Sequence, residues 1–107
     1  MGPKTSKLAA TLVDIVILLR SENEEHWARY LSDCHALLLG SDYSGVEKLL
    51  SSYGGMGSFN DLVLGYSKTA AGLTPGARKL NDKLDLLRRK AYELAKDIQR
   101  SAQIGGN

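Results

Sequence analysis

The sequence predicts an all-α fold: a compact bundle of four to five helices with a long C-terminal helix. Apolar residues recur at helical spacing along most of the chain, and glycines and capping residues separate these stripes. The one β-branched stretch that could form a strand, Val13 to Ile17, has no partner strand elsewhere. A chain of 107 residues suffices for one core. We therefore expect a single helical domain over residues 1–107, with frayed ends at 1–4 and 105–107.

The first helix is expected from about Thr5 to Arg20. Its main apolar stripe consists of Leu8, Leu12, Ile15, Val16 and Leu19. Apolar residues also cover its other sides, so it should lie at the centre of the bundle. Two lysines before this run resemble the start of a signal peptide, but Asp14 interrupts it and charged residues follow. The run is also too short to cross a bilayer, which favours a core helix of a cytoplasmic protein without membrane contact.

The second helix is expected to start at a capping box formed by Ser21 and Glu24, and to end at about Leu39, before Gly40. Its apolar face consists of Trp27, Tyr30, Leu31, Cys34, Leu37 and Leu38. The capping pattern recurs at Ser44, with a glutamate three residues later, and predicts a third, short helix. The apolar residues of that helix are Val46, Leu49, Leu50 and Tyr53.

A glycine-rich loop follows, and we expect it to be a structural motif of the fold. Its residues are Gly54, Gly55, Met56, Gly57, Ser58, Asn60 and Asp61. Ser58 is the expected N-cap of a fourth short helix from Phe59 to about Tyr66, with Asp61 favourably placed for the helix dipole. The loop could cradle a phosphate with its backbone N–H groups. Because it lacks the lysine and following Ser/Thr of a P-loop, a tight interhelical turn is favoured.

The last helix is expected to start at Thr74-Pro75, a cap followed by proline at the first helical position. Its apolar residues recur at steps of three and four: Leu80, Leu84, Leu87, Ala91, Leu94 and Ile98. This stripe predicts a long helix packed against the others, or a coiled coil that would permit a homodimer.

The sequence offers little of what catalysis requires. His26 and His35 lie nine residues apart on one expected helix, too far apart to share a metal ion. Cys34 and His35 are neighbours whose side chains point about 100° apart on a helix, so they form neither a chelate nor a nucleophile pair. We therefore expect no metal, no cofactor, no catalytic residue and no enzymatic activity; a small hydrolase is a remote third possibility.

Charge is unevenly distributed along the chain. Residues 1–65 contain five basic and eight acidic residues, a net charge of −3, whereas residues 66–107 contain nine basic and four acidic residues, a net charge of +5. The acidic half could form a surface for a basic partner, with solvated helix faces as the alternative. The residues expected on that surface are Glu22, Glu24, Glu25, Asp33, Asp42 and Glu47.

The basic half suggests nucleic-acid binding as a second possibility. Arg88, Arg89 and Lys90 form the densest basic cluster of the last helix, and phosphate contacts require such charges. Acidic residues are interleaved at spacings that allow local ion pairs, which favours a solvated outer face instead.

The segment between Tyr53 and Leu64 resembles a group of small bacterial proteins that share a Gly-Gly-Met-Gly-Ser-x-Asn-Asp-Leu core. The resemblance covers about residues 8–66 and includes the upstream pattern of Trp27, Asp42-Tyr43 and Leu49-Leu50. Small helical proteins of this sort resemble the immunity proteins that accompany secreted bacterial toxins, including those of contact-dependent inhibition systems. The resemblance implies a non-enzymatic protein that neutralises a cognate toxin, such as a nuclease, and it assigns no binding residue. The alternative function is regulatory nucleic-acid binding through the basic C-terminal helix.

Overall fold

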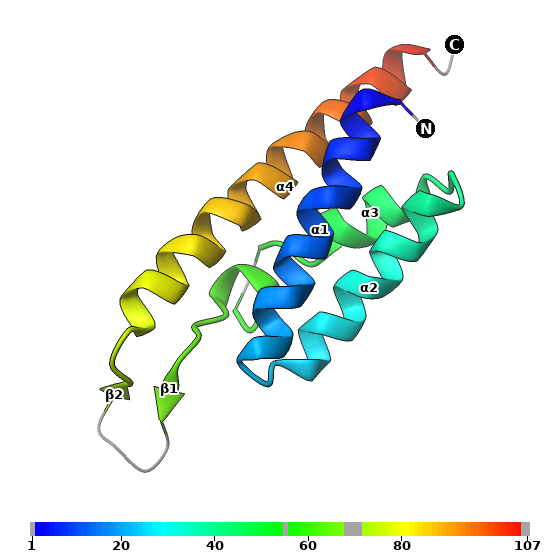
Figure 1. The fold of residues 1–107 in the computed structure, drawn as a ribbon. Helices are drawn as coiled ribbons and strands as arrows, with labels where there is room; N and C mark the ends of the chain where they lie inside the picture. The colour runs from blue at the N-terminus through cyan, green and yellow to red at the C-terminus, as the bar shows by residue number, and fades with distance from the viewer. Residues whose placement is uncertain (1, 55, 68–71, 106–107) are drawn as a thin grey trace.

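The computed structural model describes residues 2–54, 56–67 and 72–105. Within them the chain forms four α-helices, and the last one is by far the longest (Figure 1). The helices are α1 Pro3–Ser21, α2 Glu25–Leu39, α3 Ser44–Ser51 and α4 Ala77–Gly105. A 3₁₀ turn, η1 Phe59–Asp61, and two antiparallel strands, β1 Tyr66–Ser67 and β2 Gly72–Leu73, connect α3 to α4. The predicted all-α bundle with a long C-terminal helix is confirmed.

Helix α1 lies between α2 and α4, as its apolar sequence predicts (Figure 1). The predicted stripe from Leu8 to Leu19 is buried in the core. The outward side of α1 is not covered: Val13 is 39% and Ile17 63% exposed there. No helix among the described residues is long and apolar enough to cross a membrane.

The predicted ends of the domain differ from the structure. Pro3 and Lys4, expected to be frayed, lie in the first turn of α1. Proline is tolerated there because an N–H group in the first turn has no hydrogen-bond partner within the helix. Gly105 is the last residue of α4, and positions 106–107 lie outside the described residues.

The capping box predicted at Ser21 is wrong. Ser21 is the last residue of α1, and its hydroxyl donates a hydrogen bond of 2.7 Å to the backbone carbonyl of Leu18. The backbone reverses at Asn23, whose φ of 61° is left-handed, and α2 then starts at Glu25. A serine hydroxyl bonds a preceding carbonyl as readily as a following N–H group, so the pattern could not decide which helix it belongs to.

The cap predicted at Ser44 is also wrong, although the short third helix that the pattern predicted is present. Ser44 is the first residue of α3, and its backbone N–H donates to the Asp42 carboxylate at 2.9 Å. Aspartate accepts such bonds from the second residue after it in Asx turns. The N-cap of α3 is therefore Tyr43, which makes no side-chain capping bond, and the Asp42 carboxylate binds the first N–H group of the helix.

The predicted fourth helix from Phe59 to Tyr66 is wrong beyond its first turn. Only η1 forms; the backbone is extended at Leu62 and bends at Leu64 and Gly65. Side chains of α4 satisfy the polar backbone groups that a helix would have used. The Asn81 amide accepts from the Leu64 N–H at 2.8 Å and donates to the Leu64 carbonyl at 3.0 Å.

The predicted start of the last helix is wrong by two residues, because Pro75 was expected as the first helical residue and Ala77 holds that position. Thr74 donates both its backbone N–H and its hydroxyl to the Gly65 carbonyl, at 2.7 and 2.8 Å, and so closes the β1–β2 hairpin. Helix α4 begins only after Gly76, whose φ of 82° is easily adopted by glycine. The predicted stripe of α4 is correct, and α1 and α3 of the same chain cover it.

Candidate functional site

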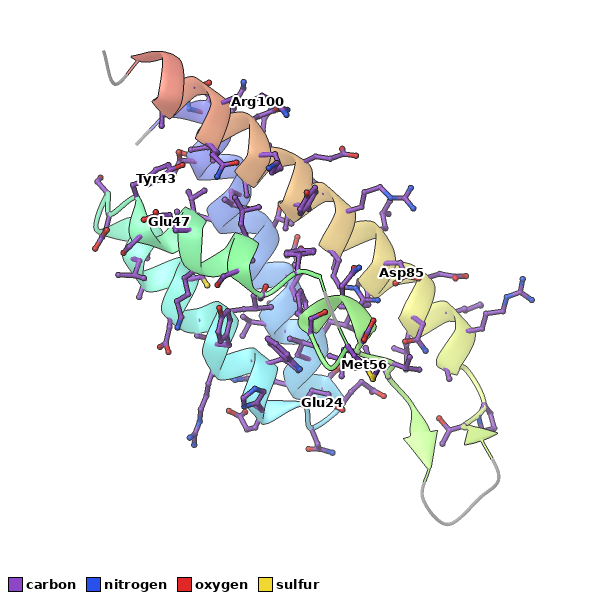
Figure 2. All side chains as sticks on the ribbon, turned by 180° about the vertical axis from the view of Figure 1, so that it is seen from behind. Glu24, Tyr43, Glu47, Met56, Asp85 and Arg100 are labelled. Atoms are coloured by element: carbon purple, nitrogen blue, oxygen red, sulfur yellow. The ribbon has the colours of Figure 1, made fainter. Side chains whose placement is uncertain are left out.

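The six acidic residues expected on one surface lie at both ends and in the middle of α2. Glu22 and Glu24 lie at the α1–α2 turn, whereas Glu47 lies on α3, beyond the other end of α2 (Figure 2). Helix α2 has 15 residues and is therefore about 22 Å long, so the structure does not bring these carboxylates into one cluster.

At the α1–α2 turn the negative charge is partly compensated. The Glu25 carboxylate lies 3.3 Å from Arg20 and 3.6 Å from Arg29. Asp33 is exposed about midway along α2. This end of the molecule therefore has a surface of mixed charge. Because its arginines already pair with Glu25, a basic partner would gain less binding energy from the acidic residues here.

The opposite end of α2 combines two acids with exposed apolar side chains. We call Leu39, Asp42, Tyr43 and Glu47 the acidic corner. Leu39 is 57% and Tyr43 37% exposed. The Glu47 N–H donates to the Tyr43 carbonyl, so these two residues lie one helical turn apart on one face (Figure 2). The hydroxyl and the N–H of Ser44 hold the pKa of the Asp42 carboxyl below its ordinary value, which keeps this carboxylate charged.

The apolar half of this corner was not predicted. Helical periodicity predicts which residues inside a helix are exposed. Tyr43 lies just before α3 and Leu39 is the last residue of α2, so periodicity could not indicate their exposure. The available clue was local: a tyrosine and a leucine flank a turn that also contains an acid. Aromatic side chains beside charged groups are typical of protein interfaces.

The glycine-rich loop is built as a turn. Gly54 and Gly57 have φ values of 93° and 78°, and Gly55 lies outside the described residues. The Gly57 N–H donates to the Asp61 carboxylate at 3.0 Å, so the chain supplies its own anion where a phosphate was considered. Ser58 occupies the predicted N-cap position, but its buried hydroxyl makes no capping bond. Met56 is 99% exposed at the loop surface (Figure 2).

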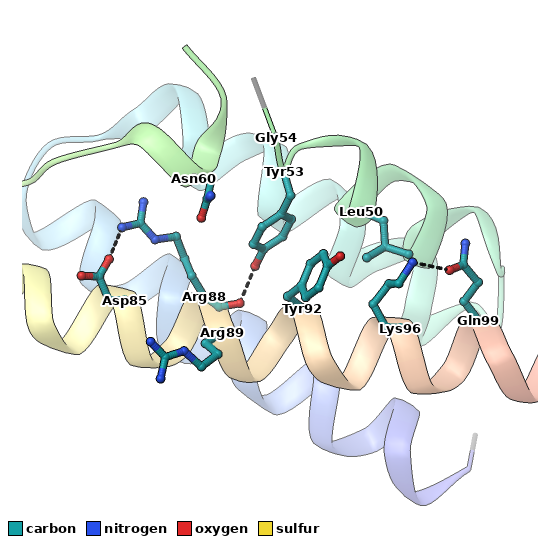
Figure 3. Close-up of a pocket in the computed structure, with 10 residues that line it drawn as sticks. All are labelled: Leu50, Tyr53, Gly54, Asn60, Asp85, Arg88, Arg89, Tyr92, Lys96 and Gln99. Atoms are coloured by element: carbon teal, nitrogen blue, oxygen red, sulfur yellow. Dashed lines mark hydrogen bonds and ion pairs between the residues drawn. The ribbon is translucent and has the colours of Figure 1, made fainter. Parts of the chain in front are cut away.

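A hollow lies between α4 and the segment formed by α3 and the glycine-rich loop. We call it the α3–α4 groove; it has a volume of about 580 Å³ (Figure 3). Its lining residues are Leu50, Tyr53, Gly54, Asn60, Asp85, Arg88, Arg89, Tyr92, Lys96 and Gln99. Among the described residues of the predicted loop motif, Gly54 and Asn60 line this groove.

Arg88 is an internal residue, unlike its neighbours Arg89 and Lys90. Only 6% of Arg88 is exposed, and its guanidinium donates to the carbonyls of Phe59 at 2.7 Å and Leu62 at 3.0 Å. It also forms an ion pair with Asp85. The basic cluster considered for nucleic-acid binding is therefore split, because successive residues on a helix point about 100° apart.

Tyr53, on the α3 side of the groove, also bonds to Arg88. Its hydroxyl donates to the Arg88 carbonyl at 2.7 Å (Figure 3). Burial raises the pKa of this phenol far above its ordinary value, so the hydroxyl remains a donor at any physiological pH. Arg88 and Tyr53 thus join the segment after α3 to α4 and give the groove its fixed walls.

Residues 20–70 match a family model described as Domain of unknown function (DUF6966). The similarity includes α2, α3, the acidic corner and the glycine-rich loop, and it leaves α4 and nearly all of α1 outside. No curated protein and no solved structure matches the chain.

The residues considered for catalysis lie apart. His26 is exposed at the start of α2, His35 is half-buried, and Cys34 is fully buried against the core. Among the described residues, no three histidine, cysteine, aspartate or glutamate side chains lie close enough to hold a metal ion. Burial raises the pKa of the Cys34 thiol to about 11. A protonated, enclosed thiol is a poor nucleophile.

This burial makes a prediction for alkaline solution. The ordinary pKa of the thiol is 9.0, so between pH 9 and about pH 11 the unfolded chain loses this proton while the folded chain keeps it. Ionisation then favours the unfolded state, and the free energy of unfolding contributed by Cys34 falls as the pH rises. We expect urea denaturation to show a steeper alkaline loss of stability for the wild type than for Cys34→Ala. Equal slopes from pH 8 to 11 would contradict it.

Proposed function

We propose that this protein is a non-enzymatic, immunity-type protein that binds and neutralises a cognate bacterial toxin in the cytoplasm. The acidic corner is the proposed docking surface. The observation that carries the proposal is its composition: an exposed tyrosine and leucine and two exposed carboxylates lie within the nine residues from the end of α2 to the middle of α3. An interface of this kind combines a buried aromatic anchor with charges that select the partner.

The charges of the corner favour a basic partner. Asp42 and Glu47 are both exposed, and no basic residue among the described residues forms an ion pair with either. A nuclease is a suitable target, because the surface that holds nucleic-acid phosphates is basic and attracts carboxylates. Glu22, Glu24, Glu25 and Asp33 lie farther along α2 and would add long-range attraction rather than direct contacts.

The proposal is tested with the toxin encoded next to this protein's gene. We expect co-purification, protection of cells from that toxin, and a dissociation constant that rises at least about tenfold for Tyr43→Ala and for Glu47→Ala, as for central interface residues. Glu93→Ala is the matched control, because Glu93 is an exposed glutamate on α4. Isothermal titration calorimetry measures each affinity.

Two results would remove the proposal. The first is the absence of both a complex and protection. The second is salt-dependent binding of DNA or RNA that disappears in Arg89→Ala/Lys90→Ala, because that result would favour the regulatory nucleic-acid-binding alternative. The two functions therefore make opposite predictions for variants of opposite charge.

A further inference from the structure

The α3–α4 groove has the dimensions of a site for a short segment of chain. Its lining on α4 runs from Asp85 to Gln99, a distance of about 21 Å along the helix axis. An extended peptide advances about 3.3 Å per residue, so the groove accommodates about six residues. Leu50 and the α3 side form one wall, and α4 forms the other (Figure 3).

The groove has an excess of positive charge. Asp85, whose side chain is 59% exposed, forms an ion pair with Arg88. Arg89 is exposed, and Lys96 is half-buried with its ammonium group 3.1 Å from the Gln99 side-chain oxygen. These two cations remain for a ligand, and they form no ion pair with any acid among the described residues.

The two cations lie on one edge of α4 at a defined spacing. Seven residues, or nearly two helical turns, separate Arg89 from Lys96, which corresponds to about 10.5 Å. Tyr92 lies between them, 39% exposed, with its ring packed against Tyr53 at a centroid distance of 5.1 Å. The groove edge therefore presents a cation, an aromatic side chain and a second cation in that order.

We propose that this groove binds an extended acidic peptide segment of a partner protein, in which two acidic residues flank an apolar one. In an extended chain, residues one, three and five point to the same side and span about 13 Å. This span is slightly longer than the distance of about 10.5 Å between Arg89 and Lys96 along α4, and their long side chains can reach the extra distance. The central apolar residue contacts Tyr92. Charge-assisted hydrogen bonds to the two carboxylates supply the selectivity.

A peptide fits this surface better than single-stranded nucleic acid does. A nucleic acid has a negative phosphate at every step, and one would lie beside the Asp85 carboxylate, whose side chain is 59% exposed at the end of the groove. A peptide backbone is neutral there. The Asn60 and Gln99 amides also line the groove, and their NH₂ groups are donors for the carbonyls of a peptide backbone.

The probe is a fluorescein-labelled peptide amide of sequence Gly-Glu-Ser-Leu-Ser-Glu, measured by fluorescence anisotropy at low salt. We expect it to bind the wild type, and Arg89→Ala/Lys96→Ala to weaken binding at least about tenfold, since each substitution removes a charged hydrogen-bond donor. Lys79→Ala/Lys83→Ala is the matched control: it removes the same charge from exposed positions of α4 outside the groove. Circular dichroism checks that all variants fold.

Several outcomes would overturn the groove proposal: no binding of the peptide, equal binding of its Gly-Gln-Ser-Leu-Ser-Gln counterpart, equal loss in the control variant, or tighter binding of a labelled oligo-dT at the same residues. The proposal does not depend on toxin binding. Arg89→Ala/Lys96→Ala should leave the affinity for the toxin unchanged, and Tyr43→Ala should leave the affinity for the peptide unchanged, so the two proposals fail separately.

Discussion

Arg88→Met is expected to lower the free energy of unfolding by about 3 kcal/mol. Methionine keeps the apolar stem of the arginine but cannot donate hydrogen bonds. The carbonyls of Phe59 and Leu62 then lose their donor in a buried setting, which costs about 1–3 kcal/mol for each group. Asp85 contributes less to the loss, because its exposed carboxylate is solvated when unpaired. Thermal denaturation should show a midpoint lower by about 10 °C or more.

Arg89→Met is the matched control for this substitution. It makes the same chemical change at the adjacent, exposed position, and we expect a change within about 0.5 kcal/mol. Trp27 gives a local readout, since its ring lies 5.4 Å from that of Phe59 in the segment that Arg88 holds. Equal stabilities for the two variants would show that Arg88 does not anchor this segment.

The helices were predictable because apolar spacing reflects burial directly. The stripe of α1 is buried and that of α4 is buried or partly buried against the core, since a helix with one apolar side gains stability only when that side leaves water. The same spacing could also have identified Arg88. It lies four residues after Leu84 and three before Ala91, so it shares the buried face of both. Grouping Arg88 with its sequence neighbours hid this position.

The ends of the helices could not be predicted from the hydroxyl residues that flank them. Ser21 bonds backward to Leu18, and Thr74 bonds to Gly65, nine residues earlier. In each case a partner carbonyl competes with the capping bond, and only the fold determines which is within reach. The segment after Phe59 is irregular for a related reason, because Asn81 on α4 satisfies its backbone groups.

The site was predictable in composition but not in arrangement. Acidic residues of α2 and α3 are exposed as expected, yet the length of α2 separates Glu24 from Glu47 (Figure 2). The α3–α4 groove joins residues about 40 positions apart, such as Tyr53 and Tyr92, and no local pattern predicts such pairs. Long-range packing determines the groove, whereas the length of α2 determines how far apart the acidic residues lie.

Gly45→Ala is expected to destabilise the fold by about 2 kcal/mol, although alanine favours helices by about 1 kcal/mol over glycine. Gly45 is buried at the contact of α3 with α2. A Cβ there would lie 2.9 Å from the Cys34 carbonyl oxygen, 3.0 Å from the Leu37 Cβ and 3.2 Å from a Leu38 methyl carbon. The nearest of these atoms belongs to the α2 backbone, so the two helices must separate, and overpacking of this kind costs about 1–3 kcal/mol.

Gly40→Ala separates this packing effect from the general effect of replacing a glycine. Gly40 follows α2 with a φ of −83°, and a Cβ there would meet only backbone oxygens at 3.6 and 3.7 Å. Urea denaturation should therefore find Gly40→Ala as stable as the wild type or slightly more stable. Because α3 positions Glu47 relative to the end of α2, Gly45→Ala should also weaken toxin binding, whereas Gly40→Ala should not. A Gly45→Ala variant as stable as Gly40→Ala would mean that α2 and α3 can separate at no cost, and the acidic corner would then lack a rigid support.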